Sequence, residues 1–270
     1  MTERLPLGDL LFLGTGTSHG IPVIGCSCEV CTSTDPRNTR TRSSIILGLP
    51  EGNLLIDTPT DLWSQFNREK LRYANAILYT HAHSDHLMGL DDVRIFSRHL
   101  EGQSILVYCE ACVEKDIRKK FDYIFDAKVQ LFYKNVLPKL LIQEIIPYKP
   151  FFALGAKVLP LRFHHGITDV LGFRFGNVAY CTDIKEIPPE TLTHLYNLDI
   201  LIIDCLGYKP HITHLNVTEV LKLVEELKPK KTFLTHISHD LEHDSFTKTS
   251  PANVIPAYDG LRLTDCKFLS

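Results

Sequence analysis

The chain has 270 residues, 44% of them hydrophobic, so we expect a substantial buried core. Its net charge of −3 predicts no overall positive field that would attract nucleic acid or an anionic membrane surface. No apolar run reaches the roughly 18 residues of a membrane span, and residues 1–16 do not resemble a signal peptide. The eight cysteines are too sparse for a disulfide scaffold, so we expect a cytoplasmic protein.

Short apolar runs rich in β-branched and aromatic residues recur along the chain and predict strands. Most end in Gly, Asp or His, so these strands should deliver polar residues at their C-terminal ends. The runs lie at 10–14, 43–48, 54–57, 76–80, 104–109, 157–163, 170–176, 178–183, 199–204 and 231–236. Helical patterns lie at 89–102 and 216–229. This alternation predicts an α/β (α+β) fold in which two sheets lie face to face with helices outside.

The segment from about 110 to 144 mixes a helical pattern with several aromatic residues and lysines. One interpretation is an insertion that acts as a lid or a dimer contact. The other is a pair of helices that covers the edge of a sheet. No linker rich in Pro, Gly or Ser divides the chain, so we expect a single domain over residues 1–270.

A histidine- and aspartate-rich sequence, THAHSDH, follows the predicted strand at 76–80. Alternate residues of an extended segment face the same side, so His81 and His83 can bind one ion. Asp85 and His86 follow after a bend, at a spacing suited to a second ion close to the first. Imidazole and carboxylate ligands suit Zn, Mn or Fe, and two such ions together activate water for hydrolysis.

A two-metal site needs further ligands, including one that bridges the ions, and other predicted strands end in suitable residues. These are His165, Asp183 and His236. Any one of them alone could be a polar core residue, but three at strand ends together favour a shared site. Asp57 ends another strand and is either a ligand or a partner that orients a ligating histidine.

This set of residues, in this order, resembles the metallo-β-lactamase superfamily over about residues 10–260. The resemblance implies an αββα sandwich with two divalent metals at the mouth between the sheets. It implies that one metal is held by His81, His83 and His165, and the other by Asp85, His86 and His236. Asp183 would bridge the two metals, and Asp57 would lie behind the ligands. His164 competes with His165, and we choose His165 because related sequences have the histidine immediately before a glycine or another small residue.

Three cysteines lie close together in the sequence GCSCEVC: Cys26, Cys28 and Cys31. Three thiolates are one ligand short of a tetrahedral structural zinc site, so a fourth should come from elsewhere. His239 is the natural candidate because it follows His236 by three residues, and His243 or His19 could replace it. The alternative interpretation is a set of free thiols.

The cysteine loop and the preceding LGTGTSHGIP sequence resemble the phosphoribosyl cyclic phosphate phosphodiesterases of phosphonate metabolism. That family places its structural-zinc histidine three residues after the last active-site histidine, which agrees with His236 and His239. The resemblance also implies a homodimer. It implies that a histidine ahead of the last metal ligand protonates the leaving group, and we choose His214 for this role. His211 is a rival, and capping of the following helix is the alternative role for the region.

These features together predict a binuclear metal-dependent phosphodiesterase acting on a small cyclic phosphate of phosphoribosyl or nucleotide type. Its catalytic residues would be Asp85, Asp183 and His214. An RNA endonuclease similar to tRNase Z is one alternative, but the net charge and the lack of an obvious basic arm argue against it. A non-hydrolytic carrier similar to the pyrroloquinoline quinone biosynthesis B proteins is another, and the complete ligand set argues against it. β-Lactamase or thioesterase activity is the last alternative.

Overall fold

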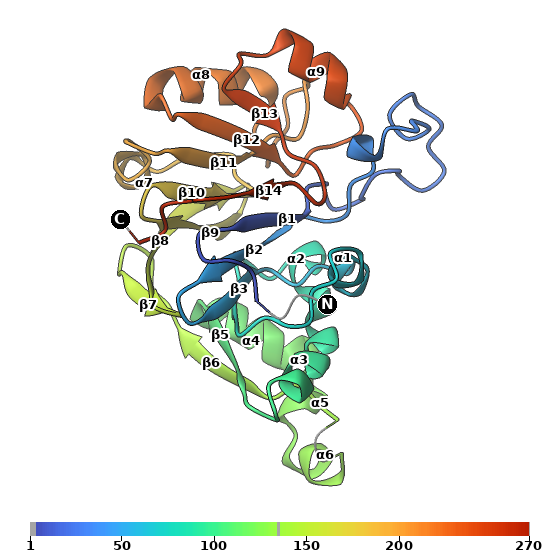
Figure 1. Cartoon of the computed structure of the whole chain (residues 1–270), viewed down its shortest axis with the longest axis vertical. Helices are drawn as coiled ribbons and strands as arrows, with labels where there is room; N and C mark the ends of the chain where they lie inside the picture. The colour runs from blue at the N-terminus through green and yellow to red at the C-terminus, as the bar shows by residue number, and fades with distance from the viewer. Residues whose placement is uncertain (1–3, 134–135, 270) are drawn as a thin grey trace.

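The computed structural model describes residues 4–133 and 136–269, and within these ranges the strands form two sheets of seven (Figure 1). The first sheet has the order β14-β1-β2-β3-β4-β5-β6. Its strands are β1 Leu10–Gly14, β2 Ser44–Leu49, β3 Gly52–Ile56, β4 Ala76–Leu78, β5 Ile105–Cys109, β6 Leu140–Glu144 and β14 Arg262–Leu263. The second sheet has the order β13-β12-β11-β10-β9-β8-β7. Its strands are β7 Phe151–Ala153, β8 Ala156–His165, β9 Thr168–Phe175, β10 Val178–Cys181, β11 Ile200–Asp204, β12 Lys231–Thr235 and β13 Val254–Pro256.

Three apolar clusters show that the layers follow the order helix, sheet, sheet, helix. The central cluster lies between the two sheets and includes Phe12 of β1 and Tyr180 of β10. The second cluster joins the outer face of the first sheet to a set of helices: α1 Leu62–Arg68, α2 Ser84–Leu87, α3 Arg94–His99, α4 Ala111–Lys120 and α5 Asp122–Phe125. The third joins the second sheet to α8 Val217–Leu227 and α9 His243–Thr249. The predicted αββα sandwich is therefore confirmed (Figure 1).

Parallel pairing brings the strand ends that carry polar residues to the same edge. Strands β3, β4, β5 and β6 are parallel in the first sheet, and β10, β11, β12 and β13 are parallel in the second. The C-terminal ends of parallel neighbours lie on one edge of a sheet, which is where open α/β sheets bind ligands. This edge of each sheet carries the residues described below.

All ten predicted strands are present, and the helix predicted at 216–229 is α8. Asn216 caps α8, since its side chain accepts from the backbone N–H of Glu219, whose side chain accepts from Asn216 in return. The helical pattern at 89–102 is confirmed over 89–99, but as two pieces, a 3₁₀ helix at Met88–Val93 followed by α3. The backbone N–H of Gly89, in the first turn, donates to the carbonyl of Thr58.

Segment 110–144 contains three helices, α4, α5 and α6 (Ala127–Phe132), followed by the edge strand β6, with residues 134 and 135 outside the described ranges. The predicted helix pair is therefore wrong for its last part, because residues 140–144 extend the first sheet through parallel pairing with β5. The lid and dimer-contact interpretations stay predictions. No helix in the described residues combines the length and apolarity that a membrane crossing requires.

Candidate metal centre

Three of the predicted site residues follow a strand directly and share an unusual backbone conformation. Asp57 follows β3, Asp183 comes just after β10, and His236 follows β12. Their φ angles are 63°, 55° and 56°, in the left-handed region that residues other than glycine rarely adopt. Such strain costs about 1–3 kcal/mol per residue and persists where the surrounding structure enforces it. The turns therefore fix the directions of these three side chains.

Asp183 is the residue around which the predicted ligands gather. Three groups of side chains offer ligand atoms that lie within 4.8 Å of one another, and Asp183 belongs to each of them. The groups are Asp85, His86, Asp183 and His236; His81, His83 and Asp183; and His165, Asp183 and His214. The structure thus brings all seven predicted active-site ligands to one place, with the predicted bridging carboxylate at its centre.

The donor atoms fit divalent metal ions. Nε2 of His81 and Nε2 of His236 are buried and have no hydrogen-bond partner in the described structure, and Nε2 of His86 lies 3.2 Å from Oδ1 of Asp183. An imidazole nitrogen buried without a partner is costly, whereas a metal ion would satisfy several of them at once. Mixed imidazole and carboxylate donors suit Zn, Mn or Fe.

The electrostatics of the cluster also favour cations. Burial lowers the pKa of His236 to about 4 and that of His81 well below its usual value, so both rings are neutral near pH 7. Neutral imidazole is the form that binds metals. Burial also opposes a charge on His86, yet the carboxylates of Asp183 and Asp85 raise the pKa of His86 well above its usual value. Carboxylates that attract a proton here attract a divalent cation as well.

Hydrogen bonds behind the cluster orient the rings. Oδ2 of Asp57 lies 2.7 Å from Nδ1 of His86 and accepts from the hydroxyl of Thr80 at the same distance. Asp57 and His86 are both completely buried. Nδ1 of His165 donates to the carbonyl of Thr213 at 2.8 Å. These contacts direct Nε2 of each ring into the cluster, and Asp57 occupies the supporting position predicted for it.

Replacing Asp57 by asparagine is expected to weaken metal binding by about 10- to 100-fold, the effect typical of losing a carboxylate behind a ligating histidine. The side chain keeps its size, but it no longer accepts a charge-assisted hydrogen bond from His86. Competition titration with a chelator would measure the affinity, and circular dichroism would report folding. An affinity equal to that of the wild type would contradict this role for Asp57.

His214 lies beside the cluster and is held by a carboxylate that sequence reasoning missed. Its Nδ1 is 3.1 Å from Oδ2 of Asp204, the buried last residue of β11, and its ring stacks on that of His236 with centroids 4.7 Å apart. Burial opposes protonation of His214, but Asp204 outweighs it and raises the pKa of His214 above its usual value. The same pattern that indicated Asp57 and Asp183, an acidic residue closing an apolar run, could have indicated Asp204.

The structure separates two pairs of rival histidines. His164 is half-buried, bonds with Asp169 at 2.7 Å and belongs to none of the described metal-competent groups, whereas His165 is buried among them. His211 is exposed and its Nδ1 accepts from the backbone N–H of Thr213, while His214 is buried against Asp204. His165 and His214, rather than their rivals, are therefore the histidines that lie at the cluster.

The cysteine loop forms a second candidate metal site. Sγ atoms of Cys26, Cys28 and Cys31 lie 3.3, 3.5 and 3.4 Å from Nδ1 of His239. A hydrogen bond from the backbone N–H of Cys31 lowers the pKa of Cys28 to about 7, which favours a thiolate. Three sulfurs and one imidazole are the donor set of a closed tetrahedral zinc site. His239 completes this group in the described structure, and neither His19 nor His243 belongs to it.

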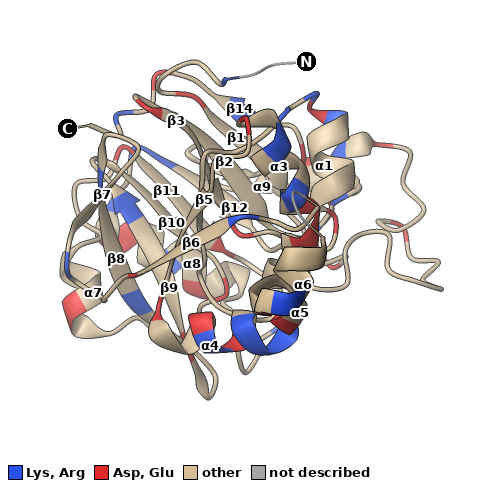
Figure 2. Cartoon of the chain, turned by 90° about the horizontal axis from the view of Figure 1, so that it is seen from below, with Lys and Arg blue, Asp and Glu red and all other residues tan. Residues whose placement is uncertain are grey.

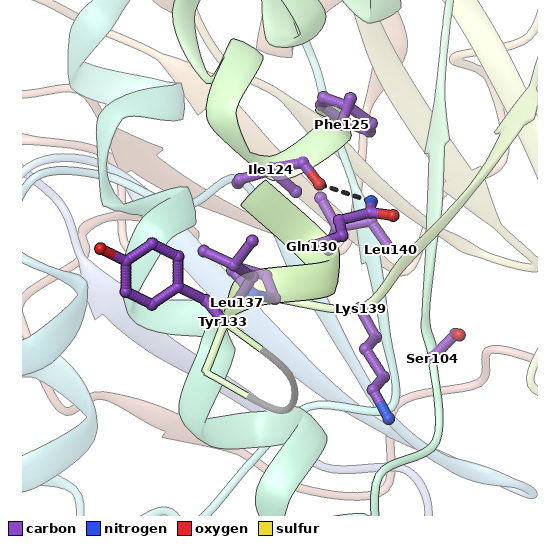
Figure 3. A pocket seen from close by; sticks show the side chains of 9 residues that line it. Ser104, Ile124, Phe125, Gln130, Tyr133, Leu137, Lys139 and Leu140 are labelled. Atoms are coloured by element: carbon purple, nitrogen blue, oxygen red, sulfur yellow. Dashed lines mark hydrogen bonds between the residues drawn. The ribbon is translucent and has the colours of Figure 1, made fainter. Parts of the chain in front are cut away.

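Two of the cavities in the described residues border different elements, and only one of these two is lined by predicted site residues. One, of about 340 Å³, lies between the two candidate metal sites and is lined by His214, His239, His211 and hydroxyl-bearing residues such as Ser238. The other, of about 390 Å³, lies beside α5, α6 and β6, and none of the predicted site residues lines it (Figure 3). The first is the candidate substrate cavity because His214 opens onto it.

Comparisons with known proteins agree with this geometry. The family described as beta-lactamase superfamily domain matches residues 52–237. The crystal structure of a diphosphatase from the PhnP family is 38% identical, with a TM-score of 0.87, over 95% of this chain and 96% of that one. The chain therefore belongs to the metallo-β-lactamase superfamily, and within it is similar to the PhnP family. The donor groups described above are of the kind that bind divalent metals, and they lie on this fold.

Other relatives add less about function. An octanoyltransferase of Porphyromonas gingivalis is 34% identical over 254 residues, which are 93% of this chain and 50% of that protein, so the chain spans about half the length of this curated relative. Zn²⁺-bound PqqB from Methylobacterium extorquens is 17% identical, with a TM-score of 0.75, over 94% of this chain and 99% of that one. The short form of human tRNase Z is also 17% identical, with a TM-score of 0.68, over 95% and 98%. These last two likenesses show the fold alone.

Proposed function

We propose that this protein is a two-metal phosphodiesterase that hydrolyses a small cyclic phosphate of phosphoribosyl or nucleotide type. The observation that carries the proposal is the position of Asp183, which belongs to every group of the histidine cluster, with His214 beside it. A shared carboxylate supports a pair of ions, and the further histidine supports transfer of a proton to a leaving group. The similarity to a PhnP-family diphosphatase supports phosphoryl chemistry.

In this proposal the chain's residues divide into two ligand sets and a bridge. His81, His83 and His165 hold one ion, and Asp85, His86 and His236 hold the other. When bound, the two ions would hold the phosphoryl oxygens and make water nucleophilic near neutral pH. Asp183 holds the two ligand sets together. The chain also keeps the site rigid, since Asp57 and the left-handed turns fix the side chains before substrate arrives.

His214 is the proposed general acid. Asp204 engages its Nδ1, which leaves Nε2 to give a proton to the departing oxygen. An alkoxide is a poor leaving group, so a positioned acid contributes most when a sugar hydroxyl departs. Asp204 keeps the ring in one orientation, as the buried carboxylate does for the histidine in a serine hydrolase.

Hydrolysis of a diphosphate is the second candidate function. The 38% identical relative from the PhnP family is described as a diphosphatase. Both reactions break a P–O bond, and the same residues would hold the phosphoryl group in each. They differ in the leaving group, which is an alkoxide in one reaction and a phosphate in the other.

A substrate panel tests the proposal. Protein loaded with Zn or Mn would be given a ribose cyclic phosphate, a nucleoside diphosphate sugar and an octanoyl thioester, the last because of the octanoyltransferase relative. We expect the cyclic phosphate to have the largest kcat/KM. A larger value for the diphosphate would replace the first candidate with the second. Turnover of the thioester alone would contradict phosphohydrolase activity.

A further inference from the structure

Helix α4 packs on the outer face of the first sheet and is held at both ends. At its N-terminal end, the carboxylate of Glu110 accepts hydrogen bonds from both terminal nitrogens of Arg162 in β8, and Nη1 lies 2.9 Å from Oε2. Both side chains are largely buried. Val113 and Ile117 fix the middle of the helix in the apolar cluster. At the other end Nζ of Lys120 donates to the carbonyl of Ala82. The helix is therefore a fixed element that joins the two sheets.

The contact with Ala82 places the positive charge of Lys120 beside residues 81–86, which we call the histidine loop. Ala82 lies between His81 and His83, and His83 is the exposed member of the predicted ligand set. An ammonium group carries three N–H donors, and Ala82 takes one of those of Lys120. The side chain of Lys120 is exposed, so its remaining donors are accessible to a ligand from solvent.

The other basic residues in the last turn of α4 are not placed in this way. Figure 2 shows basic residues gathered where α4 meets α5. Arg118 pairs with Glu114 at 2.8 Å and lies over the ring of Phe125. No contact with the histidine loop is described for Lys119, which is also exposed. Lys119 therefore offers a control of the same charge on the same turn.

We infer that Lys120 is a substrate-binding residue that holds an anionic phosphoryl group at the mouth of the metal centre. The inference rests on the proposed function, because it deepens the same site. The ammonium group would attract a charged phosphoryl oxygen, and the fixed helix would hold it in place before binding. Segment 110–144 would then contribute to the site through the end of α4.

Binding of inorganic phosphate to the zinc-loaded protein tests this without requiring turnover. We expect Lys120→Gln to raise the Kd for phosphate about fivefold, the size of one partly exposed ion pair. Lys120→Arg should keep an affinity close to that of the wild type, and Lys119→Gln should change nothing. Calorimetry at low and high salt would measure these values, and the difference between wild type and Lys120→Gln should shrink at high salt.

Metal analysis of each variant separates binding of the anion from support of the loop. Unchanged phosphate affinity in Lys120→Gln at full metal content would overturn the inference. A loss of metal in Lys120→Gln would also overturn it, since the residue would then position the loop through Ala82. If phosphate binding depends on Lys120 but no diester is cleaved, the inference stands and the proposed function fails.

Discussion

The variant Asp183→Asn should lose both ions of the histidine cluster and keep the ion of the cysteine loop. Asparagine has the same size and tolerates the left-handed backbone that Asp183 adopts, so the change removes charge with little backbone strain. Since Asp183 belongs to all three groups of donors, we expect metal affinity to fall by more than about 100-fold. This loss is larger than the one typical of removing a residue that only hydrogen-bonds to a ligand. Elemental analysis after dialysis would show one retained metal, and turnover of any phosphate ester should fall with it.

Asp169→Asn is the matched control, because Asp169 is an exposed carboxylate paired with His164 outside the cluster. It should keep full metal content and activity. If Asp183→Asn retains both cluster ions with unchanged affinity, Asp183 does not bridge them.

The variant His214→Ala should lose more activity on a substrate with a poor leaving group than on one with a good leaving group. With an alkyl or sugar phosphodiester we expect kcat to fall by about 10²- to 10³-fold, the contribution typical of general acid catalysis. With bis(p-nitrophenyl) phosphate we expect a loss below about tenfold, because p-nitrophenolate departs readily without a proton. The measurement is the ratio of the two kcat losses, taken on protein with its metal content determined.

The rival His211 supplies the control, since it is exposed and lies outside the metal-competent groups. His211→Ala should change kcat by the same factor on both substrates, because His211 lines the candidate substrate cavity but belongs to none of the described metal-competent groups. A ring nitrogen of His214 lies within 4.8 Å of the ligand atoms of His165 and Asp183, so a ligand role has a distinct outcome. Equal losses on both substrates, together with loss of metal, would make His214 a ligand and not the acid.

The ligand set was predictable from sequence because strand ends are predictable. Apolar runs that close in His or Asp mark where buried strands reach an edge, and parallel pairing then brings these ends together. The resemblance to known metallohydrolases supplied the division of ligands between the ions. The distinction between His164 and His165 follows from the alternation of side chains along β8, which sends neighbouring residues to opposite faces.

Other features depended on contacts between distant segments. No local pattern signals the left-handed conformation of Asp183 and His236, because nothing in either residue type requires it. Lys120 is the last residue of α4, whose charged pattern resembles that of a solvent-exposed helix, and only the contact with Ala82 distinguishes it from Lys119. The strands β13 and β14 have three and two residues, too short for an alternating pattern.

The pairing of β14 with β1 has a consequence for synthesis of the chain. Leu10 of β1 pairs with Leu263 of β14, so the edge of the first sheet closes only after residue 263 has been made. The cysteine loop likewise waits for His239. Until then β1 has an open edge of unpaired backbone groups, which other chains can join. Folding on the ribosome should therefore not be complete before residues 262–263 emerge, and until then the nascent first sheet should be a target for chaperones.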